Sequence, residues 1–314
     1  MESKNNWKAW LYLAPTIILM AVFTFYPILN TFYVSFLKDY NYITGSFTGF
    51  TFDNYIDVLT PINNSGSGSF FNQVMQIALP NTILLTVITV PCSIGLALLI
   101  AIGLNSIKWL KKIFQTIFFL PYVTNAIAIG MVFAVIFDTD YGIINSIFGL
   151  DKFGWIYPSA QSGEAVNYWA GVAAISIYIV WHSLPYKILI FLGGLQNIDK
   201  QYYDAAKIDA ASKFKTTRKI TIPLLSPQIL YVAITSFIGA FKEYNSVIGL
   251  FGSSGGAFDI STGPRNMTTM VYFIYDQIAK NKVQYASAAA VFLFVIIMIF
   301  TLIQFKVSKK RVHY

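Results

Sequence analysis

The sequence predicts an all-α polytopic membrane protein with six transmembrane helices. Of its 314 residues, 56% are hydrophobic and only 11% are charged, whereas soluble domains carry roughly 25% charged residues. Six stretches are long and apolar enough to cross a bilayer, which needs about 20 apolar residues. They lie at 10–36, 78–104, 113–137, 167–190, 228–250 and 285–305. We expect residues 1–314 to form a single transmembrane domain.

The first stretch is predicted to be a retained helix, because it is longer than a secretory signal and no small-x-small cleavage site follows it. Several of the other stretches contain proline, which membrane helices tolerate because their neighbours satisfy the freed carbonyls. The segments at 38–77, 138–166 and 251–284 are irregular connections, and none is long enough for an independent domain.

Basic residues predict the orientation of the chain. With the N-terminus inside, 16 of the 22 Lys and Arg residues fall in cytoplasmic pieces, if Lys187 is counted with the segment after the fourth span. Cytoplasmic loops are enriched in Lys and Arg, so both termini are predicted to be cytoplasmic. The net charge of +8 then reflects topology, and a nucleic-acid partner is not expected.

A polar segment at 199–222 separates the fourth and fifth spans. Asp199 is a suitable N-cap for a short helix from Lys200 to Ile208, and Ser212 is a suitable N-cap for a second one. A short helix held between two membrane helices acts as a lever, because movement of its docking site tilts both.

The same segment carries a motif. Asp204-Ala205-Ala206 is followed by Asp209-Ala210-Ala211-Ser212, and later by Ile220-Thr221, Pro223, Leu225 and Pro227. This pattern resembles the EAA loop of permease subunits of binding-protein-dependent ABC importers. Asp204 replaces the family's Glu, Ala210 its Gly and Phe214 its Trp. We interpret Ala210 as a sign that the backbone there avoids the left-handed region, where alanine costs about 1 kcal/mol or more.

The resemblance implies a type I ABC importer (MetI-like) permease fold with a cytoplasmic coupling helix, placed in a bacterial plasma membrane. It also implies the partners: a second permease subunit of similar fold, two nucleotide-binding ATPase subunits and an extracytoplasmic solute-binding protein. The residues expected to couple to the ATPase are Tyr203, Asp204, Ala205, Ala206, Ile208, Asp209, Ala210, Ala211 and Phe214.

The chain itself is expected to be non-catalytic. It contains no G-x-x-x-x-G-K-[ST] phosphate-binding loop, so ATP and Mg are expected on the partner subunits. The single cysteine, Cys92, argues against a thiolate metal site. The two histidines, His182 and His313, are too few for the clustered residues of a membrane-embedded enzyme. We therefore expect no metal and no cofactor in this chain.

The resemblance extends to the carbohydrate-uptake branch of the family, the maltose, multiple-sugar and glycerol-phosphate type. Trp181-x-x-x-Pro185-Tyr186 precedes the loop, and Tyr285-Ala286-Ser287-Ala288 opens the sixth span. The implied cargo is a sugar or oligosaccharide, with glycerol phosphate or another polyol as the alternative. The implied substrate-binding residues are Trp181, His182, Ser183, Tyr186, Ser236, Gly239, Ala240, Lys242, Glu243 and Asn245.

Physical reasoning supports part of that set, because ionisable residues within membrane spans are costly and usually face a cavity or a partner. Lys242 and Glu243 are adjacent, so on a helix their side chains diverge by about 100°. Packing roles for Trp181, His182 and Tyr186 stay open.

A secondary transporter is a distant alternative, since the sequence shows no internal duplication. A membrane enzyme and an assembly factor are weaker alternatives still.

Overall fold

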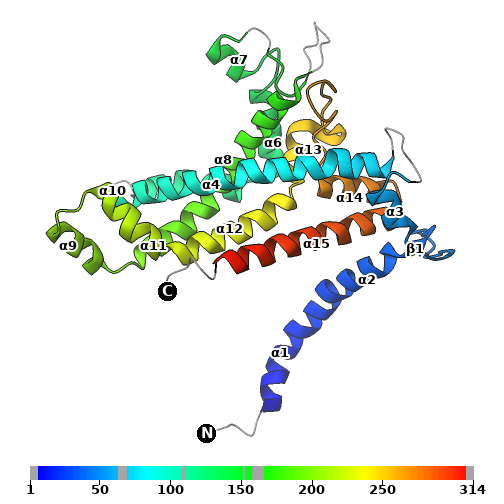
Figure 1. Cartoon of the computed structure of the whole chain (residues 1–314), viewed down its shortest axis with the longest axis horizontal. Helices are drawn as coiled ribbons and strands as arrows, with labels where there is room; N and C mark the ends of the chain where they lie inside the picture. Colours follow the sequence, from blue (N-terminus) through cyan, green and yellow to red (C-terminus); the bar gives the residue numbers. More distant parts are fainter. Residues whose placement is uncertain (1–5, 63–68, 108–110, 151–152, 158–165, 309–314) are drawn as a thin grey trace. The chain divides into compact units, whose positions relative to one another are not determined.

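The computed structural model describes residues 6–62, 69–107, 111–150, 153–157 and 166–308, and this part is predominantly helical (Figure 1). The elements in chain order are α1 (Asn6–Met20), η1 (Ala21–Phe25), α2 (Tyr26–Ser35), β1 (Leu37–Lys38), β2 (Gly49–Phe50), α3 (Asp53–Leu59), η2 (Asn72–Ala78), α4 (Leu79–Ser106), α5 (Lys111–Val123), α6 (Ala126–Ile136), α7 (Ile143–Phe148), α8 (Tyr168–Gln196), α9 (Lys200–Ile208), α10 (Lys213–Thr216), η3 (Thr217–Thr221), α11 (Ile222–Leu224), α12 (Ser226–Phe241), α13 (Asn245–Phe251), η4 (Gly252–Ser254), α14 (Met270–Ala279) and α15 (Val283–Ser308).

Four helices are continuous and apolar enough to cross a membrane: Trp10–Ser35, Asn72–Ser106, Tyr168–Gln196 and Val283–Ser308. Two further pairs of helices pass the same test only when each bent pair is taken together. Thr116–Val123 meets Ala126–Ile136 at 106°, and Lys213–Leu224 meets Ser226–Phe241 at 66°. The described part therefore has four helices that could cross a membrane, and it reaches the predicted six spans if each bent pair is one span.

The predicted fifth span, 228–250, was wrong at its far end. Helix α12 ends at Phe241, and residues 245–250 belong to the separate helix α13. The break has a local cause, because the Glu243 carboxylate accepts a hydrogen bond of 3.0 Å from the Ser246 N–H at the start of α13. The Glu243 carbonyl also accepts one of 2.6 Å from the Thr269 hydroxyl. These bonds hold Glu243 at a helix junction.

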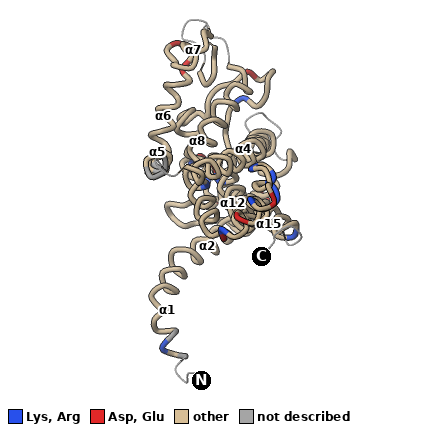
Figure 2. The backbone as a smooth tube through the Cα atoms, turned by 90° about the vertical axis from the view of Figure 1, so that its left-hand side faces the viewer, with Lys and Arg blue, Asp and Glu red and all other residues tan. Residues whose placement is uncertain are grey.

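The chain divides into two compact units, and the first contains Met1–Val74 and Phe273–Val295. Its α1–η1–α2 helix is apolar along its length, and Figure 2 shows charge only near its N-terminal end. The helix leads into the antiparallel β1–β2 hairpin, in which Leu37 pairs with Phe50.

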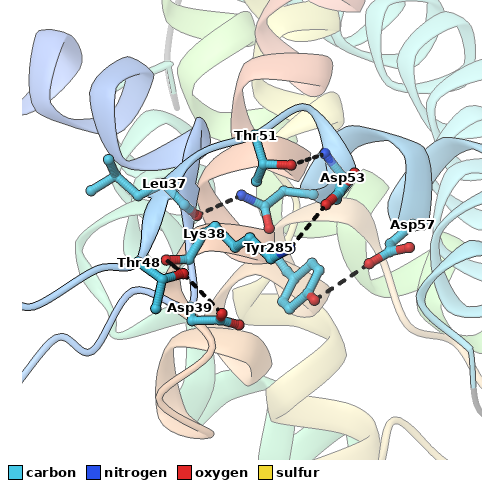
Figure 3. Close-up of polar contacts among 9 residues, drawn as sticks. Leu37, Lys38, Asp39, Thr48, Thr51, Asp53, Asp57 and Tyr285 are labelled. Carbon is cyan, nitrogen blue, oxygen red and sulfur yellow. Dashed lines mark hydrogen bonds and ion pairs between the residues drawn. The ribbon is translucent and has the colours of Figure 1, made fainter.

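Polar contacts join this hairpin to α3, and α3 to the start of α15 (Figure 3). The buried Asn54 amide donates to the carbonyls of Ser35 and Leu37 at 3.0 and 2.9 Å, and the Tyr285 hydroxyl donates to Asp57 at 3.4 Å. The Asn54 bonds satisfy two carbonyls where the helix ends and the hairpin begins, which fixes the exit of the chain from the first span.

The second unit contains Met75–Tyr272 and Ile296–Tyr314, and its centre is formed by α4, α8 and α12 lying side by side (Figure 1). Its buried side chains form two hydrophobic clusters. One includes Ile175 and Tyr178 from the first half of α8 and Leu250 from α13. The other includes Phe191 and Leu192 from the second half of α8. The middle of α8 therefore lies between two apolar cores.

Helix α13 packs closely on α6 through a pair of glycines. A Cβ atom built on Gly130 would lie 2.7 Å from the Gly249 Cα, and one on Gly249 would lie 2.8 Å from the Gly130 Cα. The two backbones can approach this closely only because neither residue has a side chain.

Candidate substrate cavity and coupling segment

A cavity of about 380 Å³ lies among α4, α8 and α12, between the two hydrophobic clusters. Seven of the ten predicted substrate-binding residues line it: His182, Ser183, Tyr186, Ser236, Gly239, Ala240 and Glu243. The remaining lining residues are Thr89, Val90, Ser93, Tyr122, Ile179, Lys187 and Thr235.

Helix periodicity explains which residues reach this cavity. The lining positions of α8 are 179, 182, 183, 186 and 187, and this i, i+3, i+4, i+7, i+8 spacing describes one face of a helix. On α12 the lining positions 235, 236, 239 and 240 form a similar stripe. A run of consecutive residues cannot all face one cavity, so part of the predicted set had to lie elsewhere.

Three predicted residues lie outside the lining. The Trp181 ring packs on Phe133 of α6, with their centroids 5.2 Å apart. Lys242 is exposed just past the end of α12, and Asn245 is exposed at the first position of α13. Lys242 and Glu243 both follow the end of α12, and only Glu243 lines the cavity.

Sequence reasoning missed Lys187 as a cavity residue and counted it as a cytoplasmic charge. In the structure Lys187 lies well inside α8 and is buried. Its ammonium donates hydrogen bonds to the hydroxyls of Ser93 and, at 3.2 Å, Ser183. The signal was available, since Lys187 is the only Lys, Arg, Asp or Glu in Tyr168–Gln196. When Lys187 is no longer counted as cytoplasmic, most of the Lys and Arg residues still fall in the predicted cytoplasmic segments.

The cavity wall combines aromatic faces with polar groups. The Tyr186 and Tyr122 rings are nearly parallel, with an interplanar angle of 18° and centroids 6.1 Å apart. The Tyr186 hydroxyl is hydrogen-bonded to the Tyr231 hydroxyl at 2.9 Å, and the buried His182 Nε2 has no hydrogen-bond partner in the described structure. Apolar surface with a few convergent polar groups is the usual character of a small-molecule site.

The polar segment at 199–222, the candidate coupling segment, folds as its caps predict. The Asp199 carboxylate accepts a bond of 3.0 Å from the Gln201 N–H at the start of α9, and the Ser212 hydroxyl accepts one of 3.3 Å from the Lys215 N–H at the start of α10. Figure 1 shows α9 and α10 projecting beyond one end of the second unit. Both helices therefore have defined starts outside the apolar bundle.

The interpretation of Ala210 was wrong, because its φ is +49°. The Ala211 N–H donates to the Ala206 carbonyl at 2.9 Å, and the Ala210 N–H donates to the Lys207 carbonyl at 3.0 Å. This 6→1 and 5→2 pair is a Schellman motif, whose C′ residue is left-handed and usually glycine. The motif ends α9 and turns the chain toward α10, and here it carries alanine.

The predicted coupling residues differ in exposure. Ala206 is buried within its own chain. Ile208 and Phe214 are 87% and 75% exposed, and Ala205 is also exposed. Asp204 is exposed and forms an ion pair of 2.7 Å with Lys207, which together with the nearby Lys200 lowers the pKa of its carboxyl.

Comparison with known proteins shows the family to which this chain belongs. Residues 93–314 match the model of the binding-protein-dependent transport system inner membrane component. The chain is 31% identical to the lactose transport system permease protein LacF of Rhizobium radiobacter, covering 97% of this chain and 95% of that protein. It is 31% identical to the arabinooligosaccharides transport system permease protein AraP of Bacillus subtilis, covering 95% and 88%.

A solved structure shares the fold. The crystal structure of a bacterial alginate ABC transporter, in complex with an alginate pentasaccharide-bound periplasmic protein, contains a chain that matches with a TM-score of 0.74 and 20% identity. The match covers 98% of this chain and 96% of that one. The protein therefore belongs to the family of inner-membrane permease components of binding-protein-dependent ABC importers.

Proposed function

We propose that this permease forms half of the pathway through which an ABC importer moves a sugar or oligosaccharide, and that the cavity among α4, α8 and α12 is part of that pathway. The observation that carries the proposal is the convergence of Tyr122, Tyr186, Ser236 and Glu243 on one cavity within membrane helices. Aromatic faces stack on the apolar faces of sugars, and hydroxyl and carboxylate groups bond their hydroxyls. The relatives named for lactose and arabinooligosaccharide transport support a carbohydrate cargo.

In this proposal the chain is non-catalytic, and ATP hydrolysis takes place on two separate nucleotide-binding subunits. A second permease of similar fold supplies the other half of the pathway, and an extracytoplasmic solute-binding protein delivers the cargo. The coupling segment then lies on the cytoplasmic side, and so do both termini. The distribution of Lys and Arg supports this orientation.

The exposed side chains Ile208 and Phe214 are the proposed anchors on the ATPase. Large apolar side chains that are this exposed on a polar segment are suited to burial against a partner. Full burial of one such side chain contributes about 1.5–3 kcal/mol, enough to hold a transient contact. Ile208→Asp and Phe214→Ala should therefore uncouple transport while the membrane subunits still assemble.

Uncoupling is measured as cargo-stimulated ATPase activity in reconstituted vesicles, with assembly checked by co-purification. Gln201→Ala is the matched control, because it truncates an exposed polar side chain on the same helix. Full stimulation in both anchor variants would show that the ATPase docks elsewhere.

The cavity is tested with two exposed helical glycines, each of which has room for a side chain. A Cβ atom on Gly239 or on Gly193 would meet nothing within 4 Å, and both residues are exposed, but only Gly239 lines the cavity. Gly239→Leu places a branched side chain in the space of the cargo. Overpacking costs roughly 1–3 kcal/mol, so uptake should fall about fivefold or more.

Gly193→Leu adds the same side chain to α8 away from the cavity and should leave uptake near the wild-type value. Equal uptake by both variants, with both assembled, would remove the cavity from the pathway.

A further inference from the structure

Lys187 is a charged group whose position the transport of a neutral sugar does not explain. It is 6% exposed and lines the cavity from the middle of a helix that is otherwise free of Lys, Arg, Asp and Glu. A charged side chain within a membrane span is costly, and it is a candidate for contact with a substrate or ion. Lys187 is therefore a candidate for a role beyond packing.

The partners of Lys187 leave its charge uncompensated. An ammonium has three N–H donors, and the structure gives it two acceptors, the hydroxyls of Ser93 and Ser183. Among the described residues, no carboxylate oxygen lies within the 4.0 Å of an ion pair with it. Hydroxyls orient the ammonium but bring no negative charge, and a buried charge without a counter-charge is unfavourable.

The cavity's own carboxylate lies at its other end. Glu243 lies two residues after the end of α12, and its carboxylate accepts a hydrogen bond from the Ser246 N–H in the first turn of α13. Lys187 lies on α8 five residues beyond His182, a rise of about 7.5 Å along the helix toward α9. The cavity is therefore lined by an acidic group near the start of α13 and by a basic group farther along α8 toward α9.

We propose that Lys187 is a specificity-determining residue that binds an anionic oxygen of the cargo. The cargo is then a saccharide or polyol carrying a carboxylate or a phosphate, oriented with its acidic group toward the α9 end of the cavity. This inference rests on the proposed function of the cavity as part of the pathway. A neutral sugar would supply a hydroxyl acceptor but leave the buried charge uncompensated, whereas an anionic oxygen supplies both an acceptor and the counter-charge.

The test compares four cargoes in vesicles containing the complete importer: a hexuronate disaccharide, its neutral hexose counterpart, glycerol phosphate and glycerol. Each is supplied at a concentration that saturates the solute-binding protein. The wild-type importer should take up at least one acidic cargo in preference to its neutral counterpart. The disaccharide pair and the glycerol pair distinguish a carboxylate from a phosphate.

Lys187→Met keeps the length of the side chain and removes the charge. Uptake of the acidic cargo should fall about tenfold or more, the value of one charge-assisted hydrogen bond, while any uptake of the neutral counterpart changes little. Lys187→Arg should restore part of the preference. Lys280→Met is the control, because Lys280 is an exposed residue in an ion pair with Asp276.

Equal loss of acidic and neutral uptake in Lys187→Met, with the complex assembled, would make Lys187 a structural link between α4 and α8 and overturn the proposal. If this variant does not assemble, the wild-type comparison decides alone, and preference for the neutral cargoes would overturn the proposal. Uptake of none of the four cargoes would also overturn the assignment of an anionic cargo. Wild-type uptake of any transported cargo by Gly239→Leu would instead count against the proposed function.

Discussion

Replacing Ala210 by glycine should stabilise the end of the coupling helix. Ala210 has a φ of +49°, and a non-glycine residue in the left-handed region costs roughly 1–2 kcal/mol. Glycine removes that cost but loses about 0.4–1 kcal/mol through the greater entropy of the unfolded chain. The net gain is therefore between about 0 and 1.6 kcal/mol, which is up to about fifteenfold in an opening equilibrium.

The assay is amide hydrogen exchange of the assembled importer, because it reports local opening free energies. The informative amides are those of Ala210 and Ala211, which donate the two bonds of the Schellman motif. Protection should rise in Ala210→Gly and fall below the wild-type value in Ala210→Val, because a β-branched residue is a severe outlier at positive φ.

Ala205 supplies a control of opposite sign. It is exposed within the same helix, where glycine costs roughly 0.5–1 kcal/mol relative to alanine, so Ala205→Gly should lower protection. Reduced protection in both glycine variants would refute the left-handed turn at Ala210 and restore the interpretation made from the sequence.

Three further predictions concern packing and charge. Gly130→Ala should destabilise the α6–α13 contact by roughly 1–3 kcal/mol, since its Cβ would lie 2.7 Å from the Gly249 Cα. The midpoint of thermal unfolding in detergent should therefore fall, and an unchanged midpoint would contradict this prediction. Asn81→Leu should lower the midpoint too, because the Asn81 amide donates to two backbone carbonyls at 2.9 Å and each buried group left unpaired costs about 1–3 kcal/mol. Finally, Lys207 lowers the pKa of Asp204. Their ion pair should therefore stabilise α9 fully above the ordinary carboxyl pKa of 3.8, and this stabilisation should be lost as the pH falls through the lowered pKa. Amide exchange measured across this acid range should show that pH dependence in the wild type and not in Asp204→Asn, and an identical pH dependence in both proteins would contradict the pairing.

The sequence alone determined the class of this protein, the approximate positions of its spans and the short helices of its coupling segment. Apolar stretches of span length define membrane helices without reference to neighbours. The caps Asp199 and Ser212 act on backbone groups two or three residues away, so local sequence was sufficient to predict where α9 and α10 begin. The family motif followed from the same local pattern.

Tertiary structure decided which of the candidate side chains share a cavity. Trp181 and His182 are adjacent in sequence, yet one packs on Phe133 and the other lines the cavity, because the direction of a helical side chain acquires meaning only when neighbouring helices are placed. Lys187 shows the same limit: the sequence records one charge near the end of an apolar stretch. The hydroxyls of Ser93 and Ser183 make it a cavity residue, and Ser93 lies 94 residues away on another helix.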